Sequence, residues 1–181
     1  NLTMDQKEAL YFYTWSGFDA LNPELYNVRW DQMDEGLKDI ASNLYNAINK
    51  FELNKTIKLV RQCAFQLFGV SHQDKMSVQE VIDHRTNNTE DGLVQVNGFM
   101  SATTKPSGTY AANHGLWIDL EVPPNKGGGA YVSDVGHNTS EAEYLLNSNT
   151  VLQFDPKSVY MDDQGYIHVS AKWVGQKADQ V

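Results

Sequence analysis

Residues 140–146, Ser-Glu-Ala-Glu-Tyr-Leu-Leu, decide how the rest of this chain is interpreted. They place two carboxylates one residue apart, at the start of a run that predicts a β-strand. Alternate strand residues face the same side, roughly 6.5–7 Å apart along the strand. We therefore expect Glu141 and Glu143 to line one cleft, where each carboxylate can do a different job.

Two other segments fit the same site. Arg61 ends an apolar run, and residues 98–104, Gly-Phe-Met-Ser-Ala-Thr-Thr, carry a cluster of hydroxyl groups after a second apolar run. A guanidinium is a planar fork of donors that suits phosphate groups. Taken alone, each pattern also fits a plainer role: an ion pair at a strand end for Arg61, ordinary strand hydroxyls for the second segment, and solvated strand carboxylates for the Glu pair.

Composition limits the classes of function. The chain has 181 residues with 14 basic and 23 acidic side chains, so its net charge is −9, which argues against general binding to nucleic acid or anionic membranes. The 41% hydrophobic content supports a sizeable core. The single cysteine excludes an internal disulfide, and the five histidines show no metal-ligand spacing. No apolar run approaches the length of about 20 residues that a membrane span needs, and we see no signal peptide.

Helical patterns come first in the chain and strand patterns later, which predicts an α+β fold. The capping box of Thr3 and Gln6 begins a helix that should end near Tyr13, with breaks at Gly17 and at Asn22-Pro23. We expect one domain over residues 1–181, with a helical subregion at 1–55 and a β-rich core at 56–175. Further elements are predicted as follows: a helix with an apolar stripe over 37–48, a short helix opening at the capping box 77–80, and strands at 56–60, 93–96, 116–122, 150–154 and 165–174.

Arg61, the Ser-Ala-Thr of residues 101–103 and the Glu-Ala-Glu of residues 141–143 resemble, in that order, the mono-ADP-ribosyltransferase toxin family. The match is to its Arg/Ser-x-Thr/Glu-x-Glu branch, and it extends to residues 2–10, Asn22-Pro23 and the segments 128–132 and 150–154. One departure is the triplet, in which Ala102 and Thr103 stand where the family usually has threonine and serine. The resemblance implies amino-terminal helices packed on a two-sheet, mainly antiparallel core with an NAD cleft.

The resemblance also assigns the chemistry. Cleavage of the nicotinamide–ribose bond gives an oxocarbenium-like ribose, which a fixed carboxylate stabilises, and that role falls to Glu143. Glu141, nearer the loop tip, would act as general base toward an acceptor guanidinium, since glutamate at this position marks arginine acceptors in the family.

Five further site residues follow from the same resemblance. Arg61 would hold the NAD phosphates or ribose, and Gln62 would offer backbone groups to the nicotinamide amide. Ser101 would bond the Glu143 carboxylate, and Thr103 would brace its strand against that of Arg61. Tyr110 is the nearest candidate to stack on nicotinamide, although it fits a packing role equally well.

We therefore expect an NAD-dependent protein-arginine ADP-ribosyltransferase with a glycohydrolase side activity, acting as a bacterial toxin or effector. It needs NAD as substrate, no metal, and a target protein that carries the arginine. We expect a monomer that is secreted or delivered into a cell, with its delivery region outside this sequence. The alternatives are an NAD glycohydrolase on the same site, a retaining glycosidase, which the spacing suits poorly, and a non-catalytic binding module of the same fold.

Overall fold

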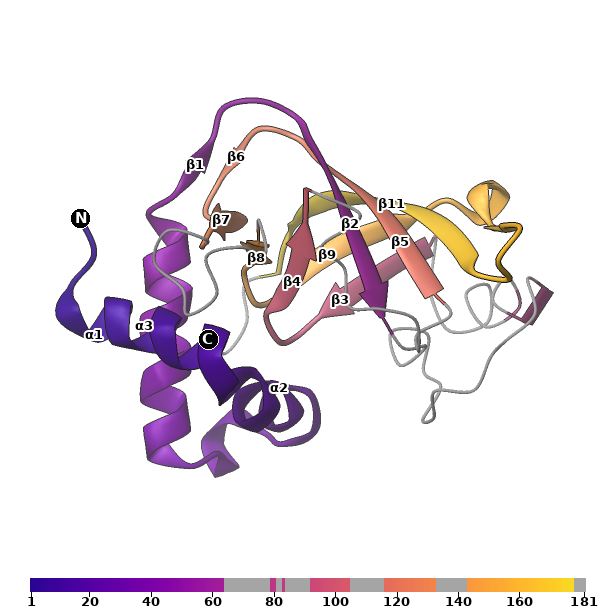
Figure 1. Cartoon of the computed structure of the whole chain (residues 1–181). Coiled ribbons are helices and arrows are strands. Elements are labelled where there is room, and N and C mark those ends of the chain that lie inside the picture. The colour runs from indigo at the N-terminus through magenta and orange to yellow at the C-terminus, as the bar shows by residue number, and fades with distance from the viewer. Residues whose placement is uncertain (64–78, 81–82, 84–91, 105–115, 133–142, 178–181) are drawn as a thin grey trace.

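A computed structural model of the chain describes residues 1–63, 79–80, 83, 92–104, 116–132 and 143–177. Helices occupy the amino-terminal third and strands follow, which confirms the predicted α+β class. In Figure 1 the helices lie to one side of the strands. The helical segments are α1 (Met4–Phe12), a π-helical segment (Tyr13–Gly17), α2 (Phe18–Asn27), a 3₁₀ turn (Trp30–Gln32) and α3 (Glu35–Asn49).

The start of α1 follows the predicted capping box. Thr3 Oγ1 accepts a hydrogen bond from the Gln6 backbone N–H at 3.2 Å, and Gln6 Oε1 accepts one from the Thr3 N–H at 3.0 Å. These bonds satisfy two backbone donors that a helix start otherwise leaves unpaired. The helical path continues beyond Tyr13 as the π-helical segment.

The predicted break at Asn22-Pro23 is wrong, because Pro23 lies inside α2. Proline removes one hydrogen bond from a helix interior. Tertiary packing offsets that loss here: Leu21 and Leu25 are buried on either side, while Pro23 is exposed, and the side chain of Asn22 is hydrogen-bonded to another segment. A helix-breaking residue in the sequence cannot by itself reveal these contacts.

Helix α3 carries the amphipathic pattern that predicted it. Asp34 caps its first turn by accepting a hydrogen bond from the Leu37 N–H at 3.1 Å. Its buried stripe consists of Ala41, Leu44, Ala47 and Ile48. The stripe packs in one core with α1, α2 and the inner side of two strands.

The described strands form one long sheet and a separate pair. The long sheet has the order β3-β9-β11-β5-β2-β4-β8-β7, with β10 paired to β11, and β1 pairs with β6. All pairings among these strands are antiparallel except that of β11 with β5. The strands are β1 (Glu52–Leu53), β2 (Ile57–Cys63), β3 (Leu93–Val96), β4 (Met100–Thr103), β5 (Leu116–Val122), β6 (Asn125–Lys126), β7 (Gly129–Tyr131), β8 (Glu143–Leu146), β9 (Thr150–Phe154), β10 (Tyr160–Met161) and β11 (Ile167–Gln176).

The predicted strands at 56–60, 93–96, 116–122, 150–154 and 165–174 correspond to β2, β3, β5, β9 and β11. Of the short helix predicted to open at 77–80, only residues 79, 80 and 83 are described, and they are helical. The rest of that prediction lies outside the described residues.

The long sheet has few paired residues between β2 and β4, and it narrows at that point. The two strands share a single paired position, Val60 with Thr103, whereas β2 pairs with β5 from Ile57 to Cys63. In Figure 1, β4, β8 and β7 form a smaller group between the helices and the other strands of the long sheet. The nine-stranded sheet and the β1–β6 pair, with their mainly antiparallel pairings, agree with the two-sheet core that the family resemblance implies.

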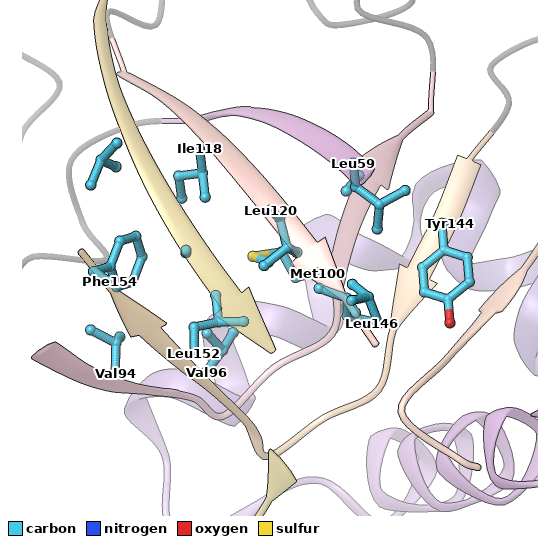
Figure 2. Packing of buried hydrophobic residues seen from close by; sticks show 14 of the residues in the cluster. Leu59, Val94, Val96, Met100, Ile118, Leu120, Tyr144, Leu146, Leu152 and Phe154 are labelled. Atoms are coloured by element: carbon cyan, nitrogen blue, oxygen red, sulfur yellow. The ribbon is translucent and has the colours of Figure 1, made fainter. Parts of the chain in front are cut away.

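Residues on β4 and β8 alternate between two cores. Met100, Ala102, Tyr144 and Leu146 pack against the larger group of strands, as Figure 2 shows for the three of them that it labels, Met100, Tyr144 and Leu146. Leu145 packs instead with the helices, as does Phe99 just before β4. Ser101 pairs with Leu145, and paired residues of antiparallel strands share a face, so the Ser101 side chain lies on the helix side of β4.

Candidate active site

Ser101 on β4 connects the predicted arginine with one of the predicted glutamates. Its Oγ donates a hydrogen bond to Glu143 Oε1 at 2.5 Å, and its carbonyl oxygen accepts one from Arg61 Nη1, also at 2.5 Å. Arg61 lies on β2 and Glu143 begins β8. Three side chains predicted from separate parts of the sequence are therefore joined through one residue.

The strand register explains this meeting. Thr103 pairs directly with Glu143 across β4 and β8, so Ser101, two residues earlier on the same face, is a diagonal neighbour within reach of the carboxylate. Thr103 also pairs with Val60, which brings the next residue of β2, Arg61, beside β4. The single pairing between β2 and β4 thus places the guanidinium at the point where the sheet narrows.

The three side chains are all partly exposed, so they are accessible to a ligand without being fully solvated. The Ser101 hydroxyl donates a hydrogen bond to Glu143 Oε1 and thereby fixes the orientation of that carboxylate. The Arg61 guanidinium adds a fixed positive charge on the adjacent strand. The site can therefore hold one carboxylate in a defined orientation beside one cation, an arrangement suited to a substrate with phosphates and a developing positive centre.

Of the other four predicted site residues, the structure describes two. Thr103 is buried, and its pairings with Val60 and Glu143 are compatible with the bracing role, which stays a prediction. The backbone of Gln62 pairs with Trp117 on β5, while its side chain is not described. Glu141 and Tyr110 lie outside the described residues.

Two residues of the helical layer approach this site, although their sequence pattern did not assign them to it. Tyr13 Oη donates to the Phe99 carbonyl oxygen at 3.3 Å, and the Asn22 amide bonds both Tyr13 and the Phe99 backbone. Burial is the main cause that raises the pKa of the Tyr13 phenol, an effect that the nearby Glu143 charge adds to and that the Asn22 hydrogen bond and Arg61 charge oppose. The only signals in the sequence were the aromatic residues of the first helix and Asn22-Pro23 itself, which we interpreted as a break.

The residues that the structure describes contain no group of three or more His, Cys, Asp or Glu side chains arranged to hold a metal ion. No helix among these residues is long and apolar enough to cross a membrane.

Residues 1–174 match the family model of the ADP-ribosyltransferase exoenzymes, and the chain belongs to that family. No curated protein sequence matches it. The chain is similar in structure to Plx2a, an ADP-ribosyltransferase toxin from Paenibacillus larvae (19% identity, 96% of this chain and 88% of that chain covered, TM-score 0.79). It is also similar to an ADP-ribosyltransferase from Clostridium botulinum (15% identity, 95% and 87% covered, TM-score 0.80). A third similar structure is the C3 exoenzyme from Clostridium limosum (12% identity, 97% and 87% covered, TM-score 0.79).

These comparisons confirm the family and the fold that the motifs predicted. Membership supports ADP-ribosyl transfer as the class of reaction. Among the similar structures that contain a ligand, C3stau2 from Staphylococcus aureus is described with NAD, and exoenzyme S from Pseudomonas aeruginosa with carba-NAD. Neither membership of the family nor the fold identifies the acceptor residue or the target protein.

Proposed function

We propose that this protein transfers ADP-ribose from NAD to an arginine side chain of a target protein and releases nicotinamide. The observation that carries the proposal is the chain of contacts from Arg61 through Ser101 to Glu143. The other glutamate of the motif, Glu141, is the reason for proposing arginine as the acceptor residue. We further propose residues 1–181 as a single catalytic domain, active as a monomer and secreted or delivered into a target cell.

Glu143 would act on the bond between nicotinamide and ribose. As that bond breaks, its electron pair moves to the nicotinamide nitrogen, which becomes neutral, and positive charge develops on the ribose. A carboxylate held by the Ser101 hydroxyl is oriented before the reaction begins, so it stabilises this charge without reorganising. Arg61, whose guanidinium has five N–H donors, would bind the NAD phosphates with donors beyond the one given to Ser101.

Glu141 would act in the second half of the reaction. A guanidinium is protonated at any usable pH and is a poor nucleophile until it begins to lose a proton. A carboxylate close to the incoming acceptor can take that proton while the new bond forms between the guanidinium nitrogen and the ribose carbon. The family resemblance associates glutamate at this position with arginine acceptors, and this chain has glutamate there.

The test is nicotinamide release from NAD in the presence and absence of agmatine, a small guanidinium acceptor, followed by mass spectrometry of agmatine. We expect agmatine to gain one ADP-ribose. Glu143→Ala should abolish both transfer and NAD hydrolysis. Glu121→Gln, which changes an exposed carboxylate on β5, is the matched control and should keep both activities.

Each alternative gives a different result. Nicotinamide release with unmodified agmatine would refute the arginine acceptor and favour a glycohydrolase or another acceptor residue. No release at all would refute the transferase and favour a non-catalytic module of the same fold.

A further inference from the structure

The side chain of Asn22 binds the backbone of Phe99 in the way a neighbouring strand would. Its Oδ1 accepts from the Phe99 N–H at 3.0 Å, and its Nδ2 donates to the Phe99 carbonyl oxygen at 3.1 Å. Nδ2 also donates to Tyr13 Oη at 3.0 Å. The amide therefore satisfies both backbone groups of the residue that immediately precedes β4.

The contact is close enough to require glycine beside it. A Cβ atom at Gly98 would lie 2.6 Å from Asn22 Oδ1 and 3.1 Å from Tyr26 Cε2. Real Cβ atoms essentially never come within 3.0 Å of such neighbours. Helix α2 is thus seated against the start of β4 with no room for a larger residue.

Tyr13 holds the same segment from the π-helical side. Its hydroxyl donates to the Phe99 carbonyl oxygen at 3.3 Å, and its ring packs edge-on against the Phe99 ring with centroids 5.6 Å apart. Both Tyr13 and Phe99 are buried. Two residues from different helical segments therefore hold the backbone of Phe99.

Phe99 lies two residues before Ser101. Over so short a stretch of extended backbone, roughly 6.5–7 Å, a displacement at Phe99 is passed directly to Ser101. Ser101 contacts Glu143 through its hydroxyl and Arg61 through its carbonyl oxygen, so a shift of Ser101 changes both contacts.

We propose that Asn22, assisted by Tyr13, is a positioning residue for ADP-ribosyl transfer, which sets the Ser101 hydroxyl against the Glu143 carboxylate. This inference rests on the proposed function. Asn22 lies in helix α2, 77 residues before Phe99 in the chain, and it acts through the backbone of Phe99. The inference therefore gives the helical layer a part in the reaction step.

The first test separates a positioning role from a structural one. Asn22→Ala removes all three amide hydrogen bonds, and Tyr13→Phe removes one donor but keeps the packed ring. We expect kcat for nicotinamide release to fall at least about 10-fold in Asn22→Ala and a few-fold in Tyr13→Phe, with KM for NAD within about twofold of wild type.

Asn147→Ala is the matched control. Asn147 is a fully buried asparagine just after β8, and its Nδ2 donates to Tyr45 O, Asn49 Oδ1 and Gly127 O. It therefore ties α3 to the strands at the end of β8 away from Glu143. Its removal should lower the unfolding temperature and leave kcat per folded molecule unchanged. An equal fall in kcat for Asn147→Ala, or an unchanged kcat in Asn22→Ala, would overturn the positioning role.

Amide hydrogen exchange gives a readout that does not depend on activity. Asn22→Ala should accelerate exchange at the amides of residues 99–101, and Asn147→Ala should not. Unchanged exchange there would overturn the coupling even if the enzyme is active. If wild type releases no nicotinamide, the proposed function fails, while exchange at these amides still decides whether Asn22 holds the strand. Should Asn22→Ala fail to fold, Tyr13→Phe carries the same measurements.

Discussion

Ser101→Ala tests the geometry of the site with the smallest possible change. The variant removes the hydroxyl that donates to Glu143 Oε1 at 2.5 Å but keeps the backbone carbonyl that accepts from Arg61. It therefore removes the hydrogen bond to Glu143 and keeps the one from Arg61. Alanine fits a strand position that is partly exposed, so the fold should tolerate the change.

The expected loss follows from the kind of hydrogen bond. A bond to a charged group contributes about 1.5–3 kcal/mol, and each 1.36 kcal/mol corresponds to about tenfold in rate. If the bond acts fully in the transition state, kcat should fall about 10- to 150-fold. Glu143 acts at the cleavage step that both reactions share, so NAD hydrolysis and transfer to agmatine should decline together.

The assay is nicotinamide release with and without agmatine, at saturating NAD, with the unfolding temperature measured in parallel. Ser170→Ala, an exposed serine on β11, is the control for a serine-to-alanine change on a strand. A kcat within twofold of wild type would refute the view that Ser101 orients Glu143. Loss of transfer alone would likewise refute it, because it would place Ser101 at the acceptor step.

Three further predictions address the acceptor, the binding of NAD and the effect of pH. Glu141→Gln should reduce transfer to agmatine while sparing much of the NAD hydrolysis; an equal loss of both would contradict the division of labour between the glutamates. Arg61→Gln should weaken NAD binding by about tenfold or more in calorimetry, as expected for one lost charge-assisted hydrogen bond, and unchanged affinity would remove Arg61 from the NAD site. Asp162 accepts a hydrogen bond from His168, and this contact, with the Tyr166 and Gln164 backbone N–H groups, holds the pKa of the Asp162 carboxyl below its usual value of 3.8. Because the carboxyl has a lower pKa in the folded state than in the unfolded state, its charged form stabilises the fold at pH values above 3.8, and this stabilisation is lost as pH falls through the folded-state pKa. The difference in unfolding temperature between wild type and Asp162→Asn should therefore shrink below about pH 4. A difference that stays constant with pH would refute this account.

The sequence alone determined the elements whose pattern is local. The apolar stripe of α3 and the alternation of β2 and β5 reflect burial of one face, which is written into consecutive residues. The order of Arg61, Ser101 and Glu143 also sufficed to indicate the family, because these residues and their neighbours resemble its motifs and the family model matches the chain. The α+β class likewise followed from the order of helical and strand patterns.

Tertiary structure alone decided which distant residues meet. Arg61 and Glu143 lie 40 and 42 residues from Ser101, and only the register of β2, β4 and β8 brings their side chains together. Pro23 stays within α2 because packing on both sides offsets a lost hydrogen bond, which no local rule contains. The binding of Asn22 to the Phe99 backbone likewise depends on how the helical layer is seated on β4, since a backbone partner leaves no signature in the side chains of the sequence.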